Sequence, residues 1–486
     1  MDLWLIFALF FAFGTLILYN KSERHFIFFM IRTKHFLNLI DKVARISPRF
    51  WKFLADLAIV LSFSGFGAAY LSRYRKFSRN LDLILTSIGL VCIFLWIPDI
   101  VFSIILLPFL ILGIRSLSRI KNPNSDFLVA TTLISGIWLR MLHWIMAVLE
   151  GMFGLSMLVF TPLVENALAI SSGESTTPGI SPVILIPFKV AGEWCFPIPG
   201  MGICIPVIYG MIALVLLLVV HEFAHGVLAR VHKLKLRSTG LVTLGIVPIG
   251  AFVEPDEEKF QKSESLTKTR VLAMGSFSNL SLGILSFLLF LYITLPSAMI
   301  VAESSVPYID VNTKIEFIGD MPASINSFDT HLFPNKLWGI DEKSIRDDKI
   351  DVTTEKGRFV LGVEDVKNIK MRAQPRFRYN YYLYGINIFE ILAGILFWSF
   401  FFNINIGLIN ILPIPPLDGG KMLPELISIL RVDKATIRKI VYVIILVGLL
   451  IILVNALPLI DMLFSRIEKI ADITFISQMS NISLIS

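Results

Sequence analysis

The stretch that decides the fold is LVLLLVVHEFAHGVLAR, residues Leu214–Arg230. It is apolar enough to lie in a membrane, yet it carries His221, Glu222 and His225 near its end. Ionisable side chains in a spanning segment cost roughly 2.5–3.5 kcal/mol on insertion scales and mark a candidate functional site. Residues four apart on a helix share one face, so both histidines can bind one ion while Glu222 reaches a water beside it. The pattern H-E-x-x-H predicts a zinc hydrolase site.

The composition of the chain indicates a membrane protein with several spans. Of its 486 residues, 55% are hydrophobic and only 17% are charged, whereas soluble domains carry about 25% charged residues. Several apolar runs exceed the 18 residues that suggest a spanning helix. The net charge of +7 does not indicate nucleic-acid binding, because the basic residues cluster in short loops beside apolar runs, which is the pattern of cytoplasmic loops.

The N-terminal part of the chain is predicted to be a membrane extension. Residues 1–160 hold four predicted spans, which are Leu3–Tyr19, Trp51–Leu71, Leu81–Ile114 and Phe127–Val159. We treat Leu81–Ile114 as one kinked crossing, although a hairpin would also account for its length and its prolines. Between the first two spans, Phe26–Ile40 mixes apolar and basic residues and is expected to lie along the membrane surface.

An external loop, residues 161–204, should follow this extension. It is polar and rich in proline and glycine. Cys195 and Cys204 flank a Pro-Gly turn within it. They either form a disulfide, if the loop faces an oxidising compartment, or stay free thiols.

The second part of the chain reads as a membrane core interrupted by a soluble domain. Residues 205–295 contain the histidine helix, a Gly- and Pro-broken stretch Thr239–Val253 and a further span. This broken stretch predicts a re-entrant hairpin, because irregular backbone at membrane depth must line a site or pack on protein. Residues 296–381 read as a small β-rich soluble domain. Two more spans fill 382–465, and 466–486 are a tail, which makes eight spans with both termini outside.

A third zinc ligand is needed, since catalytic zinc normally has three protein ligands and an open position. The best candidate is Asp418 in the stretch Asn410-Ile-Leu-Pro-Ile-Pro-Pro-Leu-Asp418-Gly-Gly. Its three prolines prevent a regular helix, and its glycines permit a tight turn close to a neighbouring helix. Charge bias places this stretch and the histidine pair at the same, cytoplasmic end of their spans.

At these residues the chain resembles the site-2 protease family of intramembrane zinc metalloproteases. The stretch from His221 to His225 matches the family's HExxH, and Asn410 with Asp418 matches its N-x-x-P-x-P-x-L-D-G motif. The broken stretch before Phe252 resembles the family's membrane-embedded β-hairpin, and the soluble insert stands where many members carry a PDZ-like domain. The resemblance covers roughly residues 205–465. Archaeal-type members of the family also carry extra N-terminal spans, as this chain is predicted to do. It implies a polytopic α-helical protein.

The resemblance also implies a mechanism and partners. One Zn²⁺ on His221, His225 and Asp418 would activate water, with Glu222 as general base and acid and Asn410 holding the substrate or the oxyanion. The substrates would be single-span membrane proteins, already shortened by another protease, whose helix must unwind before cleavage. The catalytic site would lie in the bilayer towards the cytoplasm, with the soluble insert outside. No nucleic acid is implied, and the oligomeric state is left open.

Two rival functions remain at this stage. A membrane zincin of the prenyl-protein protease type would take its third ligand from a later glutamate, for which Glu390 and Glu425 are the candidates. A metal-handling transporter or receptor would use the soluble insert as a binding module. Transporters often carry repeated halves and ionisable residues on several spans, whereas here those residues concentrate in one zinc-type pattern.

Overall fold

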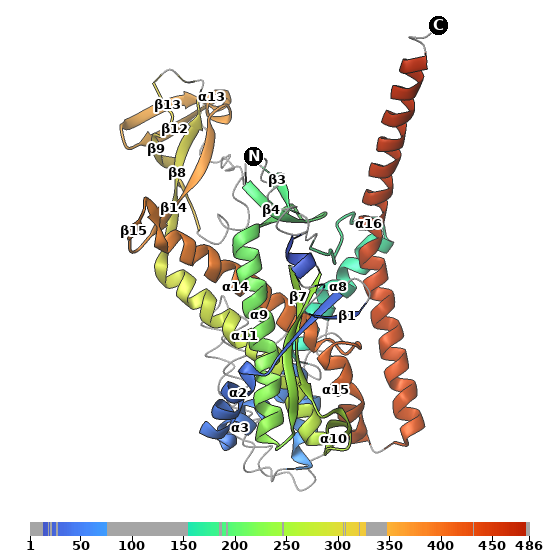
Figure 1. Cartoon of the computed structure of the whole chain (residues 1–486). Coiled ribbons are helices and arrows are strands. Elements are labelled where there is room, and N and C mark those ends of the chain that lie inside the picture. The colour runs from blue at the N-terminus through green and yellow to red at the C-terminus, as the bar shows by residue number, and fades with distance from the viewer. Residues whose placement is uncertain are drawn as a thin grey trace, which may run out of the picture. The chain divides into compact units, whose positions relative to one another are not determined.

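The structure is a computed structural model, and it divides into two compact units. It describes residues 13–74 (without 18, 20–21 and 26–27), 154–183, 187–190, 193–244, 247–326 (without 305, 307 and 320) and 348–482 (without 431). The first unit comprises Met1–Ser181, Leu214–Ser281 and Phe402–Ser486, and the second comprises Pro182–Ala213 and Leu282–Phe401. Figure 1 names the elements. Each unit is described by itself below.

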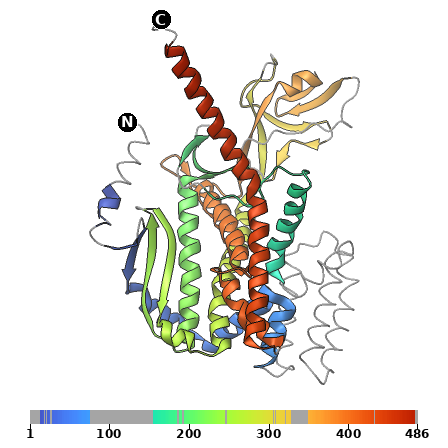
Figure 2. The ribbon, with the colours of Figure 1, turned by 90° about the vertical axis from the view of Figure 1, so that its right-hand side faces the viewer.

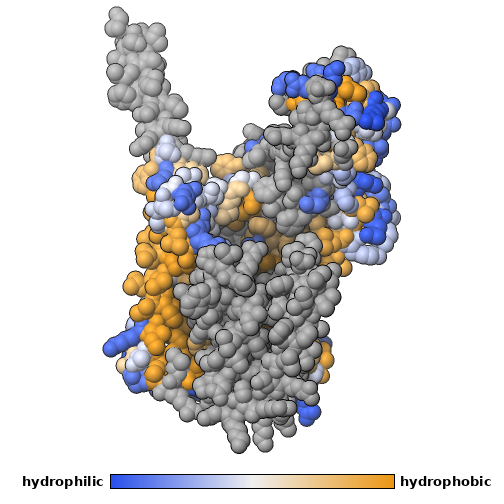
Figure 3. Space-filling model, turned by 180° about the vertical axis from the view of Figure 1, so that it is seen from behind, coloured by the Kyte–Doolittle hydropathy of each residue, from blue (hydrophilic) through white to orange (hydrophobic). Residues whose placement is uncertain are grey.

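Four described helices are long and apolar enough to cross a membrane. They are α9 (Val207–Val231), α11 (Ser265–Ile293), α14 (Ile388–Ile411) and the part Lys434–Ser465 of α16 (Lys434–Ile482). These four match the four spans predicted for the second part of the chain. The exposed residues of α16 include Tyr442, Leu446 and Leu450, and Figure 3 shows an apolar surface along the helix that ends in the grey C-terminal segment.

The predicted N-terminal spans are only partly described. Leu81–Ile114, most of Leu3–Tyr19 and most of Phe127–Val159 lie outside the described residues. Trp51–Leu71 lies within the helix α3 (Pro48–Ser72), which is not among the four candidate spans. Much of α3 is buried in the core of the first unit, and it carries the buried Asp56. The predicted count of eight spans therefore stays a prediction.

The predicted hairpin at Thr239–Val253 is a β-hairpin in the structure. Strands β6 (Leu236–Leu244) and β7 (Val247–Pro255) pair antiparallel, with Thr239 opposite Val253. Its small and β-branched residues suit a strand, where branched side chains pack on the pleated surface. Whether the hairpin lies inside the membrane stays a prediction.

Two further strands extend this hairpin. Within the predicted surface segment Phe26–Ile40, the described residues form β2 (Phe28–Thr33) and the beginning of α2 (His35–Ile46). Whether this segment lies along the membrane surface stays a prediction. Strand β2 pairs antiparallel with β6, and β1 (Glu23–His25) pairs with β2. The sheet order β1-β2-β6-β7 leaves β7 as an edge strand among the described residues, and Figure 2 shows the blue strand beside the yellow-green hairpin.

A buried ion pair fixes α3 within the first unit. Asp56 on α3 is fully buried and accepts two hydrogen bonds from Arg270 on α11, at 2.7 Å from Nε and 2.9 Å from Nη2. Nearby, the hydroxyl of Tyr70 lies 2.6 Å from that of Ser265. A bidentate arginine–carboxylate pair adds geometric specificity as well as energy. The N-terminal helix α3 is therefore held against the span that follows the hairpin.

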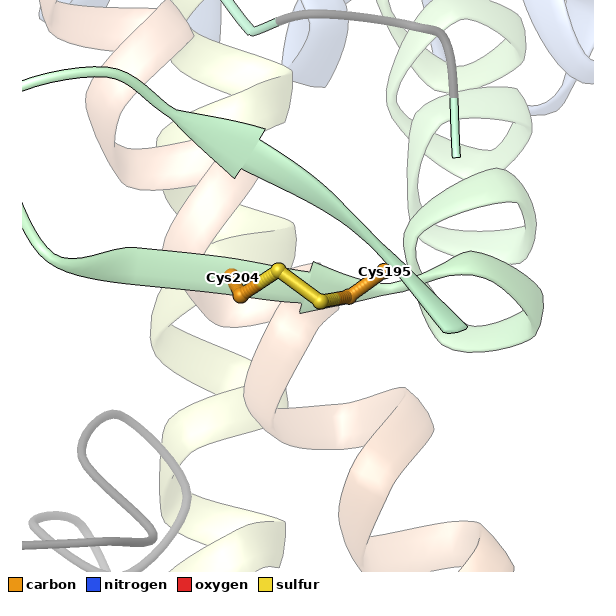
Figure 4. Close-up of a disulfide and its surroundings, with 2 residues drawn as sticks. All are labelled: Cys195 and Cys204. Carbon is orange, nitrogen blue, oxygen red and sulfur yellow. A yellow bond between two sulfur atoms is a disulfide. The ribbon is translucent and has the colours of Figure 1, made fainter. Parts of the chain in front are cut away.

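The segment 161–204, expected to be a loop, is partly regular. Helix α8 (Leu155–Ser171) continues past the predicted end of its span, because residues 163–170 remain mostly apolar. Residues 188–206 form a three-stranded antiparallel sheet of β3 (Phe188–Val190), β4 (Glu193–Ile198) and β5 (Ile203–Pro206). A disulfide between Cys195 and Cys204 joins β4 to β5 (Figure 4). The structure therefore has the disulfide and not two free thiols.

The described part of the soluble insert contains a seven-stranded antiparallel sheet in the second unit. Its main path is β11-β8-β9-β12-β13, with β10 on β9 and β14 on β8. The strands are β8 (Thr294–Glu303), β9 (Lys314–Ile318), β10 (Met321–Pro322), β11 (Ser324–Ile325), β12 (Lys349–Thr354), β13 (Gly357–Gly362) and β14 (Lys370–Phe377). One apolar cluster, with Val301, Ile315 and Val352 buried, forms its core. The PDZ-like interpretation stays a prediction, because residues 327–347 lie outside the described part.

Candidate metal centre

Helix α9 presents the two histidines on one face. Nε2 of His221 lies 3.0 Å from Nε2 of His225. Residues four apart lie one above the other on an α-helix, which brings the two imidazoles together. Apart from Glu222, the helix is apolar around the two histidines, and His221 is buried.

The proline-rich turn after α14 brings Asp418 to the same place. Asp418 is the first residue of α15 (Asp418–Ile427) and is buried. Its Oδ2 lies 3.2 Å from Nε2 of His221 and 3.2 Å from Nε2 of His225. Gly420 makes this approach possible, since a Cβ there would meet the backbone of Ile414 and Pro415. The structure thus joins residues that are nearly 200 positions apart in the chain.

The three ligand atoms fit a zinc ion. Their separations of 3.0, 3.2 and 3.2 Å form a nearly equilateral triangle. Two ligands of a tetrahedral zinc, each about 2.0–2.1 Å from the metal, lie about 3.3 Å apart. Moreover, Oδ2 of Asp418 is buried without a hydrogen-bond partner, as expected of an atom meant to bind a cation. Among the described residues, these three are the one group of His, Cys, Asp or Glu that could hold a metal.

A lysine lies beside the second oxygen of Asp418. Oδ1 lies 3.6 Å from Nζ of the half-exposed Lys421. A metal-binding carboxylate must be ionised, and a cation at this distance favours the ionised form.

Each histidine has a second contact that orients its ring. Nδ1 of His225 lies 2.7 Å from the carbonyl oxygen of Val271 on α11. Nδ1 of His221 lies 3.1 Å from the side-chain amide of the fully buried Asn279, also on α11. Such contacts on the second ring nitrogen fix the tautomer and the orientation of metal-binding histidines.

Gly275 on α11 leaves the space that the two rings occupy. A Cβ at this position would meet Cε1 of His225 at 2.5 Å and Cε1 of His221 at 2.6 Å. Contacts below 3.0 Å are not seen for real Cβ atoms, so a side chain here would displace the rings. The helix α11 therefore contributes Val271, Gly275 and Asn279 to the centre, one turn apart from one another.

Glu222 lies next to the centre and faces the edge of the hairpin. Its Oε2 accepts a hydrogen bond of 3.0 Å from the backbone N–H of Val253 on β7. It is not one of the three clustered residues, which agrees with its expected role as a base rather than a ligand. Because Val253 turns its N–H towards Glu222, the backbone groups of this edge point to the catalytic side.

The other predicted site residues are not among the three clustered ligands. Asn410 is half-buried in the last turn of α14, at the opposite end of the proline-rich turn from Asp418. The rival ligand Glu425 forms an ion pair with Lys268 at 2.6 Å, and Glu390 belongs to the second unit. Neither glutamate is part of the His–His–Asp cluster.

The sequence analysis did not select Val271, or the pair Gly275 and Asn279, for the metal centre. Their spacing of four residues, ending in a polar side chain within an apolar helix, is the signal that could have drawn attention to them. The carbonyl of Val271 carries no signal in the sequence, because any residue supplies one.

Apolar spanning helices around a His–His–Asp cluster are the features of an integral membrane metalloprotease. A comparison with protein families places the chain plainly: it belongs to Peptidase family M50, whose family model matches residues 209–455. This is the site-2 protease family of zinc metalloproteases, as the resemblance of the motifs indicated. The chain is also similar to an uncharacterized protein of Methanocaldococcus jannaschii, with 26% identity over 281 residues, which cover 55% of this chain and 67% of the relative.

Proposed function

We propose that this protein is a zinc-dependent intramembrane endopeptidase that cleaves transmembrane segments of membrane proteins in regulated intramembrane proteolysis. The observation that carries the proposal is the zinc-sized triangle formed by Nε2 of His221, Nε2 of His225 and Oδ2 of Asp418. Two of these residues belong to an apolar helix long enough to span a membrane. Family membership supports the reaction class.

Each predicted site residue has its own role in the proposed cleavage reaction. His221, His225 and Asp418 would hold zinc, which when bound acidifies water and polarises the carbonyl of the scissile bond. Glu222 takes a proton from the attacking water and delivers it to the leaving amine nitrogen. Asn410 is proposed to hold the substrate backbone or to donate a hydrogen bond to the developing oxyanion.

The edge of β7 is proposed to receive the substrate. A transmembrane helix has its amide groups already hydrogen-bonded, so its backbone must be unwound before cleavage. An extended segment can replace those bonds by adding to a sheet edge. In an antiparallel strand alternate residues face the same edge, so Ala251 faces outward as Val253 does. A substrate strand paired at Ala251 would pass beside Glu222, which contacts the N–H of Val253.

The orientation and the partners follow from the same proposal. The basic residues after α9 favour a cytoplasmic position for the end of α9 that carries His221. The disulfide Cys195–Cys204 precedes α9 in the chain. It favours an oxidising, external side for the N-terminal end of α9. The soluble insert would then be external and would admit single-span substrates that another protease has already shortened.

Replacement of the proposed base tests the reaction. Glu222→Gln should bind one zinc per chain, as the unaltered protein does, and should fail to cleave a labelled single-span peptide in proteoliposomes. The loss should be at least about 10²-fold, the lower range for a general base. A chelator should abolish cleavage by the unaltered protein, and added zinc should restore it. Unchanged cleavage by Glu222→Gln would contradict the proposal.

Replacement of the third ligand separates the proposal from the prenyl-protein protease type. Asp418→Ala should no longer bind one zinc per chain, because His221 and His225 are the only two protein ligands that remain. Glu425→Ala is the matched control, since it lies on the same helix but pairs with Lys268; it should keep its zinc. The reverse result would show that a glutamate completes the site.

A further inference from the structure

A short hairpin with exposed tyrosines joins the soluble sheet to α14. Strands β15 (Tyr382–Leu383) and β16 (Ile386–Asn387) pair antiparallel, and Ile388 begins α14 directly afterwards. Most exposed residues of this hairpin and its approach are apolar or aromatic: Tyr379 (44%), Tyr381 (62%), Tyr382 (64%), Leu383 (48%), Tyr384 (97%) and Ile386 (55%). The polar Asn380 and Gly385 are also exposed. No residue between Arg378 and Glu390 is charged. We call this set the tyrosine hairpin.

One of the two residues at the tip of the tyrosine hairpin does not suit its turn. Tyr384 and Gly385 both have positive φ, at 49° and 80°. A two-residue turn of this kind favours Asn, Asp or Gly at both positions. Tyrosine is unfavourable there, because its Cβ crowds the left-handed backbone. The turn therefore does not account for Tyr384, and its nearly complete exposure points to a contact outside the chain.

Hydrogen bonds fix the hairpin to the beginning of α14. The N–H of Ile388 donates to the carbonyl of Tyr381 at 2.9 Å. The buried Asn387 donates from Nδ2 to Oδ1 of Asn380 at 2.9 Å and accepts from the N–H of Phe389 at 3.1 Å. The hairpin thus cannot move independently of the first turn of this spanning helix.

The approach to the hairpin is also fixed to the end of α11. The hydroxyl of Tyr379 lies 3.0 Å from the hydroxyl of Tyr292, the penultimate residue of α11. Arg378 donates from Nε to the carbonyl of Tyr292 at 2.9 Å and lies over its ring, 5.4 Å from the centroid. Figure 1 shows β15 beside the end of α11 and the beginning of α14. One span ends and another begins at this hairpin.

We infer that the tyrosine hairpin lies in the membrane interface, where its tyrosine, leucine and isoleucine side chains contact lipid at the boundary of headgroups and acyl chains. Tyrosine is enriched at this depth because its ring is apolar and its hydroxyl is polar. The tip is about 10 Å of extended chain from the first residue of α14, at about 3.3 Å per residue. The hairpin therefore lies close to the plane in which α11 ends and α14 begins. Lipid that contacts the exposed apolar surfaces of these two helices would also reach the hairpin.

The full-length protein in lipid nanodiscs provides the test. A spin label is attached at Tyr384→Cys in a background with Cys92→Ser, because Cys195 and Cys204 form the disulfide. Tyr382→Cys is a second probe, which leaves the turn unaltered. Val360→Cys on β13 is the matched control, with the residue 62% exposed on the soluble sheet. Collision rates with oxygen, which concentrates in lipid, and with a water-soluble nickel complex are measured at each site.

The two hairpin labels should collide with the nickel complex several-fold less, and with oxygen several-fold more, than the label at residue 360. Equal nickel collision at all three sites would overturn the inference, because the hairpin would stand in water. Protection from both reagents would also overturn it, since protein rather than lipid would cover the tyrosines. The inference rests on the spans α11 and α14 and not on protease activity, so its failure would leave the proposed function untouched.

Discussion

Gly275 shows how a single missing side chain can create the metal centre. Its Cα faces both imidazoles, and a Cβ would lie 2.5 and 2.6 Å from their Cε1 atoms. Gly275→Ala should therefore displace His221 and His225 and reduce the zinc content of the purified protein well below one per chain. Gly250→Ala is the control, because its Cβ would meet Val242 at an ordinary 3.5 Å. Full zinc occupancy in Gly275→Ala would show that the rings can move aside.

Asn279 should determine how tightly His221 binds zinc. With zinc on Nε2, the ring carries its proton on Nδ1 and needs an acceptor. Nδ2 of Asn279 lies 3.1 Å from Nδ1 of His221, whereas Oδ1 of Asn279 is buried without a hydrogen-bond partner. Rotation of the amide by 180° exchanges these two atoms, so that Oδ1 accepts the proton of Nδ1. Asn279→Ala should weaken zinc binding about 10–100-fold, measured by competition with a chelator. Asn279→Asp keeps an acceptor and should retain most of the affinity. Equal loss in both variants would contradict the acceptor role, because aspartate keeps both the acceptor and the shape of asparagine.

The pair of Asp56 and Arg270 connects an N-terminal element to the centre. Val271, whose carbonyl contacts His225, directly follows Arg270. Asp56→Ala leaves the buried guanidinium unpaired, which should cost about 3–5 kcal/mol and lower the thermal unfolding temperature in detergent. Glu258→Ala is the control, because its pair with Lys262 is about three-quarters exposed and such surface pairs contribute about 0–1 kcal/mol. Similar shifts for the two variants would contradict this account.

Elements with local signals could be predicted from the sequence, whereas those made by distant pairing could not. The HExxH helix, the hairpin after it and the Asp418 turn each carry their own pattern of residues. Strand β2 does not: its pairing partner β6 lies about 200 residues away, and the basic residues around it resemble those of a membrane-surface segment. The pairing of α3 with Arg270, 214 residues further on, likewise has no local signal in the sequence.

At the scale of the molecule, two independent features favour the orientation proposed for α9. Before the helix, Cys195 and Cys204 are joined in the β4–β5 hairpin, and disulfides persist in oxidising compartments. After the helix, Arg230, Lys233, Lys235 and Arg237 form a basic cluster, which is typical of the cytoplasmic side. A helix of 25 residues is about 37 Å long, enough to separate these two environments.

This orientation predicts where each end of α9 can be labelled in sealed, right-side-out membrane vesicles. The disulfide should be opened by a reductant that does not cross membranes, after which a bulky impermeant maleimide should label Cys204, which is less buried than Cys195. Lys262→Cys, on the segment after the hairpin, should be labelled only once the vesicles are opened by detergent. A Cys92→Ser background removes the remaining thiol, and Cys195→Ser/Cys204→Ser removes the first signal as a control. Labelling of residue 262 in sealed vesicles, with the disulfide protected, would mean that the catalytic side faces outward.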